Sequence, residues 1–258
     1  MKVIFLFFLS LPHNTFAIDV VLATGVNTDP PYVYGDEVID AEHPGITIEV
    51  LKLIEARSEI NFIIKKMPWS RVVHSVKKNE LDGGFHFSFK PDRVSFVSYP
   101  TNMNEDEYLP DSHFSLYSES YYLYRLIDYS AAWRDKNRKL VVGVIRGSSV
   151  SSLLVELGYE LKEVSHDRQL ARLLLSGRID AYAGLQNMHD AKLKQMEPEQ
   201  RSLIEKVHPE LSQKPYYIGF SKHFYRNHKD VAWSIWNIIA DIKLSGELDD
   251  LYLKYASE

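Results

Sequence analysis

Residues 80–83 read Glu-Leu-Asp-Gly, and residues 178–181 read Arg-Ile-Asp-Ala. In both stretches a predicted helix ends, an apolar residue and an aspartate follow, and a small residue enters a predicted strand. The preceding helices are predicted over 70–78 and 167–175 from the spacing of their apolar residues. Two lobes built on one plan would repeat a sequence in this way. Only four positions match, so coincidence is the alternative.

Strands and amphipathic helices alternate on both sides of these two stretches. This alternation predicts an α/β fold in which each lobe has a mostly parallel sheet flanked by helices. The strands are expected at 18–24, 61–65, 84–87, 140–145 and 181–183.

Two aromatic segments, 121–125 and 216–221, flank the second half of the chain. We interpret them as the two crossings between the lobes, so the chain leaves the first lobe once and returns once. The predicted division is then 18–119 with 220–258 for lobe 1, and 120–219 for lobe 2. Two crossings form a hinge, and a ligand would bind in the cleft between the lobes.

The N-terminal residues 1–17 differ in composition from the rest of the chain. Lys2 precedes a continuous apolar run, Pro12 ends that run, and small residues stand at Thr15 and Ala17. The run is too short to span a bilayer, so we expect a secretory signal peptide cleaved after about Ala17. A buried N-terminal strand is the alternative. The expected location is therefore the periplasm.

The overall composition excludes several classes of protein. The net charge is -5 and no basic run is interleaved with aromatic residues, so no nucleic-acid partner is expected. The chain has no cysteine, which excludes thiol nucleophiles, thiolate metal sites and a lipid-modified N-terminal cysteine.

The chain resembles the extracytoplasmic solute-binding proteins of the amino-acid-binding type, family 3, as a divergent member. The resemblance covers nearly the whole chain and rests on the order and spacing of short segments. These segments lie at 29–32, 68–71, 79–83, 88–93, 143–149, 177–181 and 215–222, with Gly246 and 254–255 near the C-terminus. The resemblance implies the type II periplasmic-binding fold and a monomer that closes on a small carboxylate-bearing solute, amino-acid-like, for delivery to an ABC-type transporter. A membrane receptor that senses the loaded protein is the alternative partner.

Arg93 is the first candidate for binding, because a guanidinium offers two parallel donors to a carboxylate. The segment 91–93 is predicted as a first helical turn, where the helix dipole disfavours a cation unless an anion is near. The resemblance places Ser88 beside it as a helper. Ser148 and Ser149 lie in a predicted strand-to-helix turn that points N–H groups and hydroxyls at one spot. A solvated arginine and an ordinary helix cap are the alternatives.

Trp69 matches the position where the family places an aromatic residue against the ligand, and Tyr32 is a candidate second wall. Packing of Trp69 against the core is the alternative. Family members carry an acidic residue for the ligand's ammonium group where this chain has Leu185. Gln186 or Asp29 could replace it. This departure leaves open whether the ligand is a standard α-amino acid.

No enzyme activity, cofactor or metal site is expected. The chain lacks a Gly-Xaa-Ser-Xaa-Gly elbow, a phosphate loop and a His-Glu-Xaa-Xaa-His pair. Its histidines are scattered, and the acidic loop at 105–111 lacks the calcium-loop pattern, so we interpret it as a solvated loop. An enzyme on the same fold, such as a dehydratase, is the remaining alternative.

Overall fold

The computed structural model describes residues 17–101, 108–129 and 138–256. Residues 1–16 of the predicted signal peptide and residues 105–107 of the acidic loop lie outside these residues. The strands are β1 (Ile18–Thr24), β2 (Ile60–Lys66), β3 (Gly83–Ser88), β4 (Val97–Ser98), β5 (Tyr117–Leu126), β6 (Val141–Ile145), β7 (Glu160–Val164), β8 (Ala181–Leu185) and β9 (Ile204–Ser221). The α-helices are α1 (Ile46–Ala56), α2 (Trp69–Lys77), α4 (Ser151–Glu156), α5 (Arg168–Leu175), α6 (Gln186–Gln195), α7 (Pro198–Arg201), α8 (Lys222–Asn227), α9 (Lys229–Leu244) and α10 (Glu247–Ala256), and η1 (Pro91–Ser95) is a 3-10 helix.

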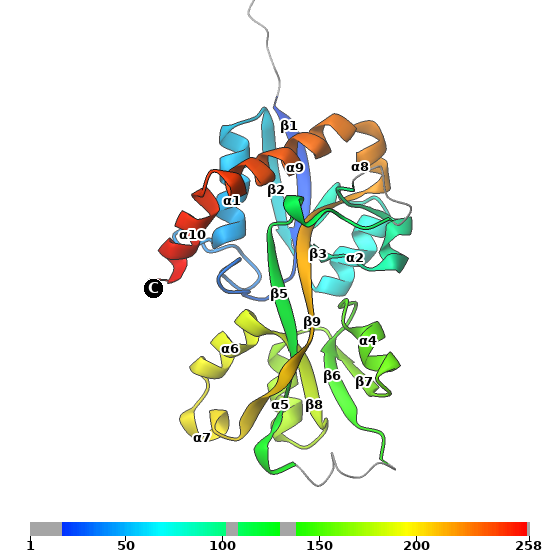
Figure 1. Cartoon of the computed structure of the whole chain (residues 1–258), viewed down its shortest axis with the longest axis vertical. Coiled ribbons are helices and arrows are strands. Elements are labelled where there is room, and N and C mark those ends of the chain that lie inside the picture. The colour runs from blue at the N-terminus through cyan, green and yellow to red at the C-terminus, as the bar shows by residue number, and fades with distance from the viewer. Residues whose placement is uncertain (1–16, 102–107, 130–137, 257–258) are drawn as a thin grey trace, which may run out of the picture.

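The described elements form two lobes stacked along the long axis of the molecule (Figure 1). The strands follow the order β2-β1-β3-β9-β5-β8-β6-β7, with β4 beside β9. The upper lobe, which corresponds to the predicted lobe 1, contains the parallel strands β2-β1-β3. The lower lobe, which corresponds to the predicted lobe 2, contains the parallel strands β8-β6-β7. The predicted α/β fold with a mostly parallel sheet in each lobe is confirmed.

The aspartates of the two repeated stretches make the same hydrogen bond in the two lobes. Oδ2 of Asp82 accepts from the backbone N–H of Val21 in β1 at 2.8 Å. Oδ2 of Asp180 accepts from the backbone N–H of Val141 in β6 at 2.7 Å. Each aspartate thus ties the entry of one strand to its parallel neighbour, in the middle of β1 and at the start of β6. The match between the two stretches therefore has a shared structural cause.

The C-terminal helices cover the upper lobe. α9 and α10 pack against α1 (Figure 1). Trp236 of α9 is fully buried, and its indole N–H donates to the carbonyl of Ile218 in β9 at 2.9 Å. Among the helices of the described residues, none combines the length and apolar character that a membrane crossing requires.

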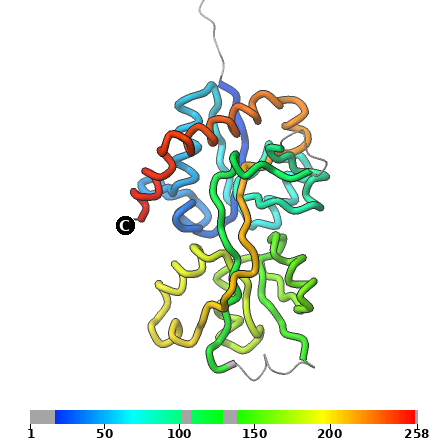
Figure 2. The backbone as a smooth tube through the Cα atoms, in the orientation of Figure 1, coloured from blue at the N-terminus to red at the C-terminus, as the bar shows by residue number. Residues whose placement is uncertain are grey.

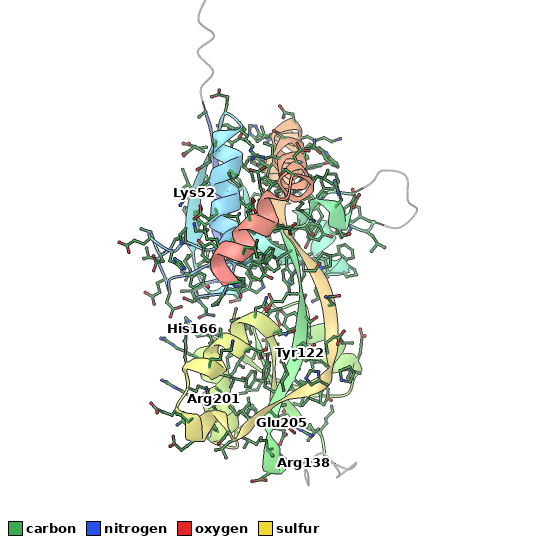
Figure 3. The ribbon with its side chains drawn as sticks, turned by 60° about the vertical axis from the view of Figure 1, so that its left-hand side comes forward. Lys52, Tyr122, Arg138, His166, Arg201 and Glu205 are labelled. Carbon is green, nitrogen blue, oxygen red and sulfur yellow. The ribbon has the colours of Figure 1, made fainter. Side chains whose placement is uncertain are left out.

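β5 and β9 join the lobes. The chain passes to the lower lobe along β5 and returns along β9 (Figure 2). The two strands form one antiparallel ladder from Tyr117 opposite Tyr216 to Leu126 opposite Ile204. In the turned view of Figure 3, Tyr122 and Glu205 mark the lower part of this ladder. The predicted lobe boundaries at 119/120 and 219/220 fall inside these strands, so the division of the chain stays a prediction.

Candidate functional site

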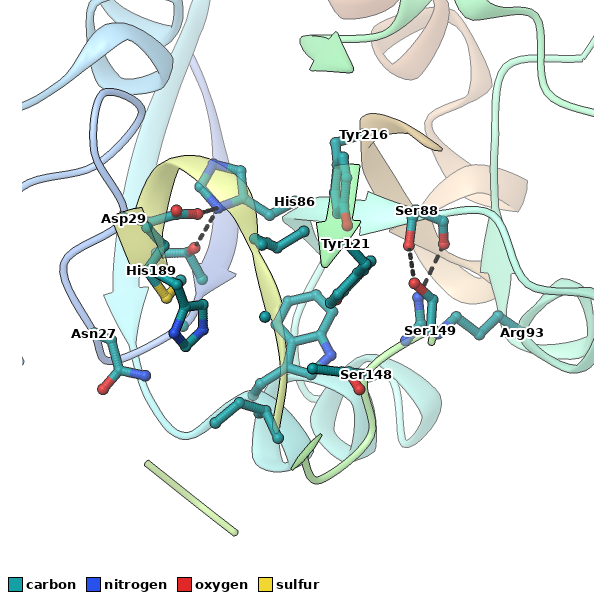
Figure 4. A pocket seen from close by; sticks show the side chains of 18 residues that line it. Asn27, Asp29, His86, Ser88, Arg93, Tyr121, Ser148, Ser149, His189 and Tyr216 are labelled. Atoms are coloured by element: carbon teal, nitrogen blue, oxygen red, sulfur yellow. Dashed lines mark hydrogen bonds and ion pairs between the residues drawn. The ribbon is translucent and has the colours of Figure 1, made fainter. Parts of the chain in front are cut away.

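A cavity of about 100 Å³ lies between the lobes, where β5 and β9 pass from one lobe to the other (Figure 4). Both lobes contribute to its wall. The lining residues are Thr24, Gly25, Asn27, Asp29, Trp69, His86, Ser88, Arg93, Tyr121, Ile145, Ser148, Ser149, Ala183, Gly184, Leu185, Met188, His189 and Tyr216. Six of the eight predicted site residues, all except Tyr32 and Gln186, are among them.

Arg93 is buried at one end of the cavity, with 2% of its surface exposed. It lies in η1, directly after β3. Its Nη1 donates to the carbonyl of Ser88 at 2.9 Å, and its Nη2 donates to the carbonyl of Gly147 at 2.7 Å. The guanidinium also lies 5.5 Å from the ring centre of Phe87 and 5.8 Å from that of Trp69. These contacts fix the direction in which the cation faces.

Hydroxyl groups from the two lobes meet beside Arg93. Ser88 at the end of β3 donates to Oγ of Ser149 at 2.7 Å. Ser148 and Ser149 are buried in the turn between β6 and α4. Gly147 opens this turn with a φ of 80°, a conformation that glycine adopts without strain. The hydroxyls and the guanidinium therefore converge on one end of the cavity as hydrogen-bond donors.

Trp69 bonds directly to the opposite lobe. Its indole N–H donates to the carbonyl of Gly147 at 3.1 Å, the same oxygen that accepts from Arg93. Its ring packs against Phe87 while still lining the cavity. Trp69 was predicted to line the ligand site, with packing against the core as the alternative, and in the structure it lines the cavity and packs against the core at once. Because one carbonyl of the lower lobe accepts from two residues of the upper lobe, the structure has its lobes closed.

Asp29 and His86 lie together at the other end of the cavity. Oδ2 of Asp29 lies 3.5 Å from Nδ1 of His86, and Nε2 of His86 lies 3.2 Å from the hydroxyl of Thr47. Oδ1 of Asp29 is buried and has no hydrogen-bond partner among the described residues. Burial raises the pKa of Asp29 to about 7, although Lys192 and Lys66 act in the opposite direction.

A β-bulge in β3 brings His86 to this position. The register of β3 against β9 shifts between Gly84 and Phe87, and His86 has a φ of 71°. Such a bulge re-aims a side chain that regular alternation would direct elsewhere. Burial and the nearby charge of Lys66 lower the pKa of His86 to about 3, so the ring is neutral.

Tyr32 and Gln186 do not line the cavity. Tyr32 stacks on Tyr117 with ring centres 3.5 Å apart, and its hydroxyl accepts from Nδ2 of Asn187 at 3.2 Å. Gln186 begins α6 and lies next to Leu185, which does line the cavity. In the structure Tyr32 is thus a contact between the lobes, and the ligand-binding roles of both residues stay predictions.

Sequence reasoning missed four aromatic side chains of the wall, Tyr121, Tyr216, His86 and His189. The two tyrosines belong to the segments predicted as crossings, and a crossing strand must pass the cleft. That signal could have found them. His189 is buried in α6 because Gly184 leaves room for it, since a Cβ on Gly184 would lie 2.1 Å from the ring. Burial lowers the pKa of His189 to about 4.

No cluster of three or more histidine, cysteine, aspartate or glutamate side chains suited to a metal ion occurs in the described residues. One end of the cavity presents a cation with hydroxyls, and the other presents a carboxyl group beside a neutral imidazole.

The family model of bacterial extracellular solute-binding proteins, family 3, matches residues 22–258. The chain belongs to this family. Membership and fold indicate a binding protein. The search of curated proteins found no match.

Solved structures share the type II periplasmic-binding fold. The substrate-binding protein of an amino acid ABC transporter is 15% identical, with 93% of this chain and 100% of that chain covered and a TM-score of 0.69. A histidine kinase sensor domain similar to periplasmic binding proteins is 16% identical, with 92% and 95% covered and a TM-score of 0.71. An amino acid ABC transporter substrate-binding protein from Streptococcus pneumoniae, bound to L-arginine, is 20% identical, with 92% and 94% covered and a TM-score of 0.68.

Proposed function

We propose that this protein binds a small carboxylate-bearing, amino-acid-like solute in the cavity between its lobes. The observation that carries the proposal is the placement of Arg93. The guanidinium is buried at the cavity wall, forms no ion pair with a carboxylate of the described residues, and has Ser88 and Ser149 beside it. A buried cation gains most from an anionic partner. The carboxylate of a ligand is that partner.

Binding and closure are coupled in this proposal. The solute first contacts the upper lobe at Trp69, Ser88 and Arg93. The turn with Ser148 and Ser149 then completes the site from the lower lobe. A ligand favours the closed form only by contacts that the open form lacks, and the serine turn supplies such contacts. The two crossings, placed within β5 and β9, act as the hinge.

The cellular role follows from the family and from the predicted signal peptide. The protein is exported to the periplasm, acts as a monomer and delivers its solute to an ABC-type transporter. A membrane sensor is the second candidate partner, because one of the similar structures is a histidine kinase sensor domain. No catalysis is part of the proposal. The lobes divide into 18–119 with 220–258, and 120–219.

The test is a binding screen of the mature chain against α-amino acids, amines, and mono- and dicarboxylates, followed by calorimetry on the tightest binder. We expect only carboxylates to bind. Arg93→Met should weaken that binding at least a hundredfold, about 3 kcal/mol, because it removes the charged partner of the carboxylate.

The matched control for this test is Arg71→Met, since Arg71 is an exposed arginine on α2. Its affinity should equal that of the unmodified protein. Unchanged affinity in Arg93→Met, with a carboxylate still bound, would remove the basis of the proposed site.

A further inference from the structure

The cavity holds one acidic and one strongly basic side chain among its described lining residues, Asp29 and Arg93. Its two histidines, His86 and His189, are neutral because burial lowers their pKa values to about 3 and about 4. The remaining lining side chains are uncharged. A ligand that carries one negative and one positive group can therefore place the negative group on Arg93 and the positive group on Asp29.

These two residues lie at opposite ends of the cavity. Figure 4 shows Asp29 with His86 on one side, Arg93 with Ser88 and Ser149 on the other, and aromatic side chains between them. Their local partners also differ. Asp29 lies 3.5 Å from His86, whereas both Arg93 hydrogen bonds go to backbone carbonyls, at Ser88 and Gly147.

The carboxyl group of Asp29 is itself evidence for a ligand group at its end. It is 6% exposed, lines the cavity, and leaves Oδ1 without a hydrogen-bond partner among the described residues. A buried carboxylate oxygen without a partner costs free energy unless a donor or a cation contacts it. A ligand ammonium or guanidinium group supplies that contact.

The Arg93 end offers no carboxylate for a ligand ammonium group, because the one acidic side chain among the described lining residues, Asp29, lies at the opposite end. Ala183, Gly184 and Leu185 of the lower lobe also line the cavity, and their side chains accept no hydrogen bond. An α-amino acid carries its ammonium group one carbon away from the carboxylate. With the carboxylate on Arg93, this ammonium would be buried without a carboxylate beside it, which is unfavourable.

Resting on the proposed function, we propose that the ligand is an ω-amino or ω-guanidino acid, a zwitterion whose cation is separated from its carboxylate by a chain of several carbons. Arg93 and the serine hydroxyls hold the carboxylate, and Asp29 holds the remote cation. The carbon chain lies against Tyr121 and Tyr216, whose rings provide apolar surface between the two ends, and against Trp69 of the cavity wall.

The experiment is calorimetry with pairs of compounds that differ in one group. 4-Aminobutanoate, 5-aminopentanoate and 6-aminohexanoate are each compared with the plain carboxylate of the same chain length and with the α-amino acid that carries an added α-amino group, such as L-lysine for 6-aminohexanoate. At least one ω-amino acid should bind tenfold or more tightly than both of its counterparts. Equal or tighter binding of the α-amino acids would overturn the inference.

Two variants test whether Asp29 causes the preference for the ω-amino acid over the plain carboxylate. Asp29→Asn should abolish the preference for the ω-amino acid over the plain carboxylate, while its affinity for the plain carboxylate stays within about threefold, because the carboxylate end is untouched. Asp36→Asn is the matched control, as Asp36 is an exposed aspartate of the same loop. It should keep the preference.

The failure of this inference differs from the failure of the proposed function. Binding of α-amino acids that depends on Arg93 but not on Asp29 would overturn the inference and leave the proposed function intact. Absence of binding by every compound of the panel would overturn both.

Discussion

The two ends of the cavity differ in how well the protein satisfies its own charges. At the Arg93 end, two carbonyls and two aromatic faces surround the guanidinium. At the Asp29 end, the carboxyl group has a neutral histidine 3.5 Å away and one oxygen without a partner. At the first end the guanidinium is already hydrogen-bonded and lacks only an anion, whereas at the second end one carboxyl oxygen has no hydrogen-bond partner among the described residues.

This difference assigns different energetic roles to the two ends. A preorganised cation, held by the bonds that also join the lobes, contributes to the stability of the closed form. A buried carboxyl group without a full set of partners lowers the stability of the ligand-free protein. Sites of this second kind trade stability for binding. The comparison therefore predicts that neutral replacements at the two ends change stability in opposite directions.

Arg93→Met should produce the largest effect. It leaves the carbonyls of Ser88 and Gly147 without their charged donor, and we expect a loss of about 3 kcal/mol in the free energy of unfolding without ligand. Urea unfolding measures this value, with Arg71→Met as the control that should not change. An unchanged stability of Arg93→Met would show that the two ends do not differ in this way.

Asp29→Asn should act in the opposite direction, with a gain of about 2 kcal/mol at pH 8. Folding raises the pKa of this acid from 3.8 to about 7, so the folded state binds more protons than the unfolded state in that range. Its contribution to stability therefore falls as the pH rises from 3.8 to about 7, and the full cost is present above 7. Asparagine does not ionise, so the variant does not have the cost of burying a charged carboxylate.

Urea unfolding of both forms between pH 3.5 and pH 8 checks this prediction. The difference in stability should be greatest above pH 7 and vanish below the ordinary pKa of 3.8. The charged groups that face Asp29 are Lys66 on β2, Glu119 on β5 and Lys192 on α6, and the other titratable groups are His86 on β3, Tyr117 on β5, Tyr216 on β9 and Tyr32. These groups are the same in both forms. A variant less stable than the original at pH 8 would contradict the assigned cost.

Trp69→Phe should give the smallest effect. The phenylalanine keeps an aromatic wall but loses the N–H bond to Gly147 in the opposite lobe, which weakens closure. We expect a fall in affinity of about fivefold, near 1 kcal/mol. Trp233→Phe is the matched control, because the indole N–H of Trp233 donates to the hydroxyl of Tyr225 within the upper lobe. Equal losses in both variants would argue against a role of the lobe-to-lobe bond.

The repeated stretches were predictable because their signal is local. A helix end followed by an aspartate and a strand entry is encoded within a few neighbouring residues. The positions before them agree as well, since Asn79 and Gly177 both have positive φ values, 58° and 65°. Arg93 and the two serines after Gly147 were predictable for the same reason, as short turns next to strands.

The Asp29 end was only partly predictable, because side-chain direction there depends on distant parts of the chain. His86 reaches the cavity through a bulge that the sequence does not indicate, and a shift of one residue reverses the face on which a side chain lies. Tyr32 was predicted as a wall, but its ring stacks on Tyr117, a residue of β5 far along the chain. Tyr121 and Tyr216 line the cavity because β5 and β9 pair there, with Tyr117 opposite Tyr216 and Tyr121 opposite Ser212.

The pairing of β9 with both β3 and β5 has a consequence for the order in which the molecule folds. In the proposed division the lower lobe is one uninterrupted stretch of chain, and β6, β7 and β8 come from neighbouring segments. The sheet of the upper lobe needs Gly83 paired with Phe220, so it waits for the last part of the chain. Contacts between distant residues carry a larger loop-closure entropy. We therefore expect the lower lobe to form first and the upper lobe to assemble around it afterwards.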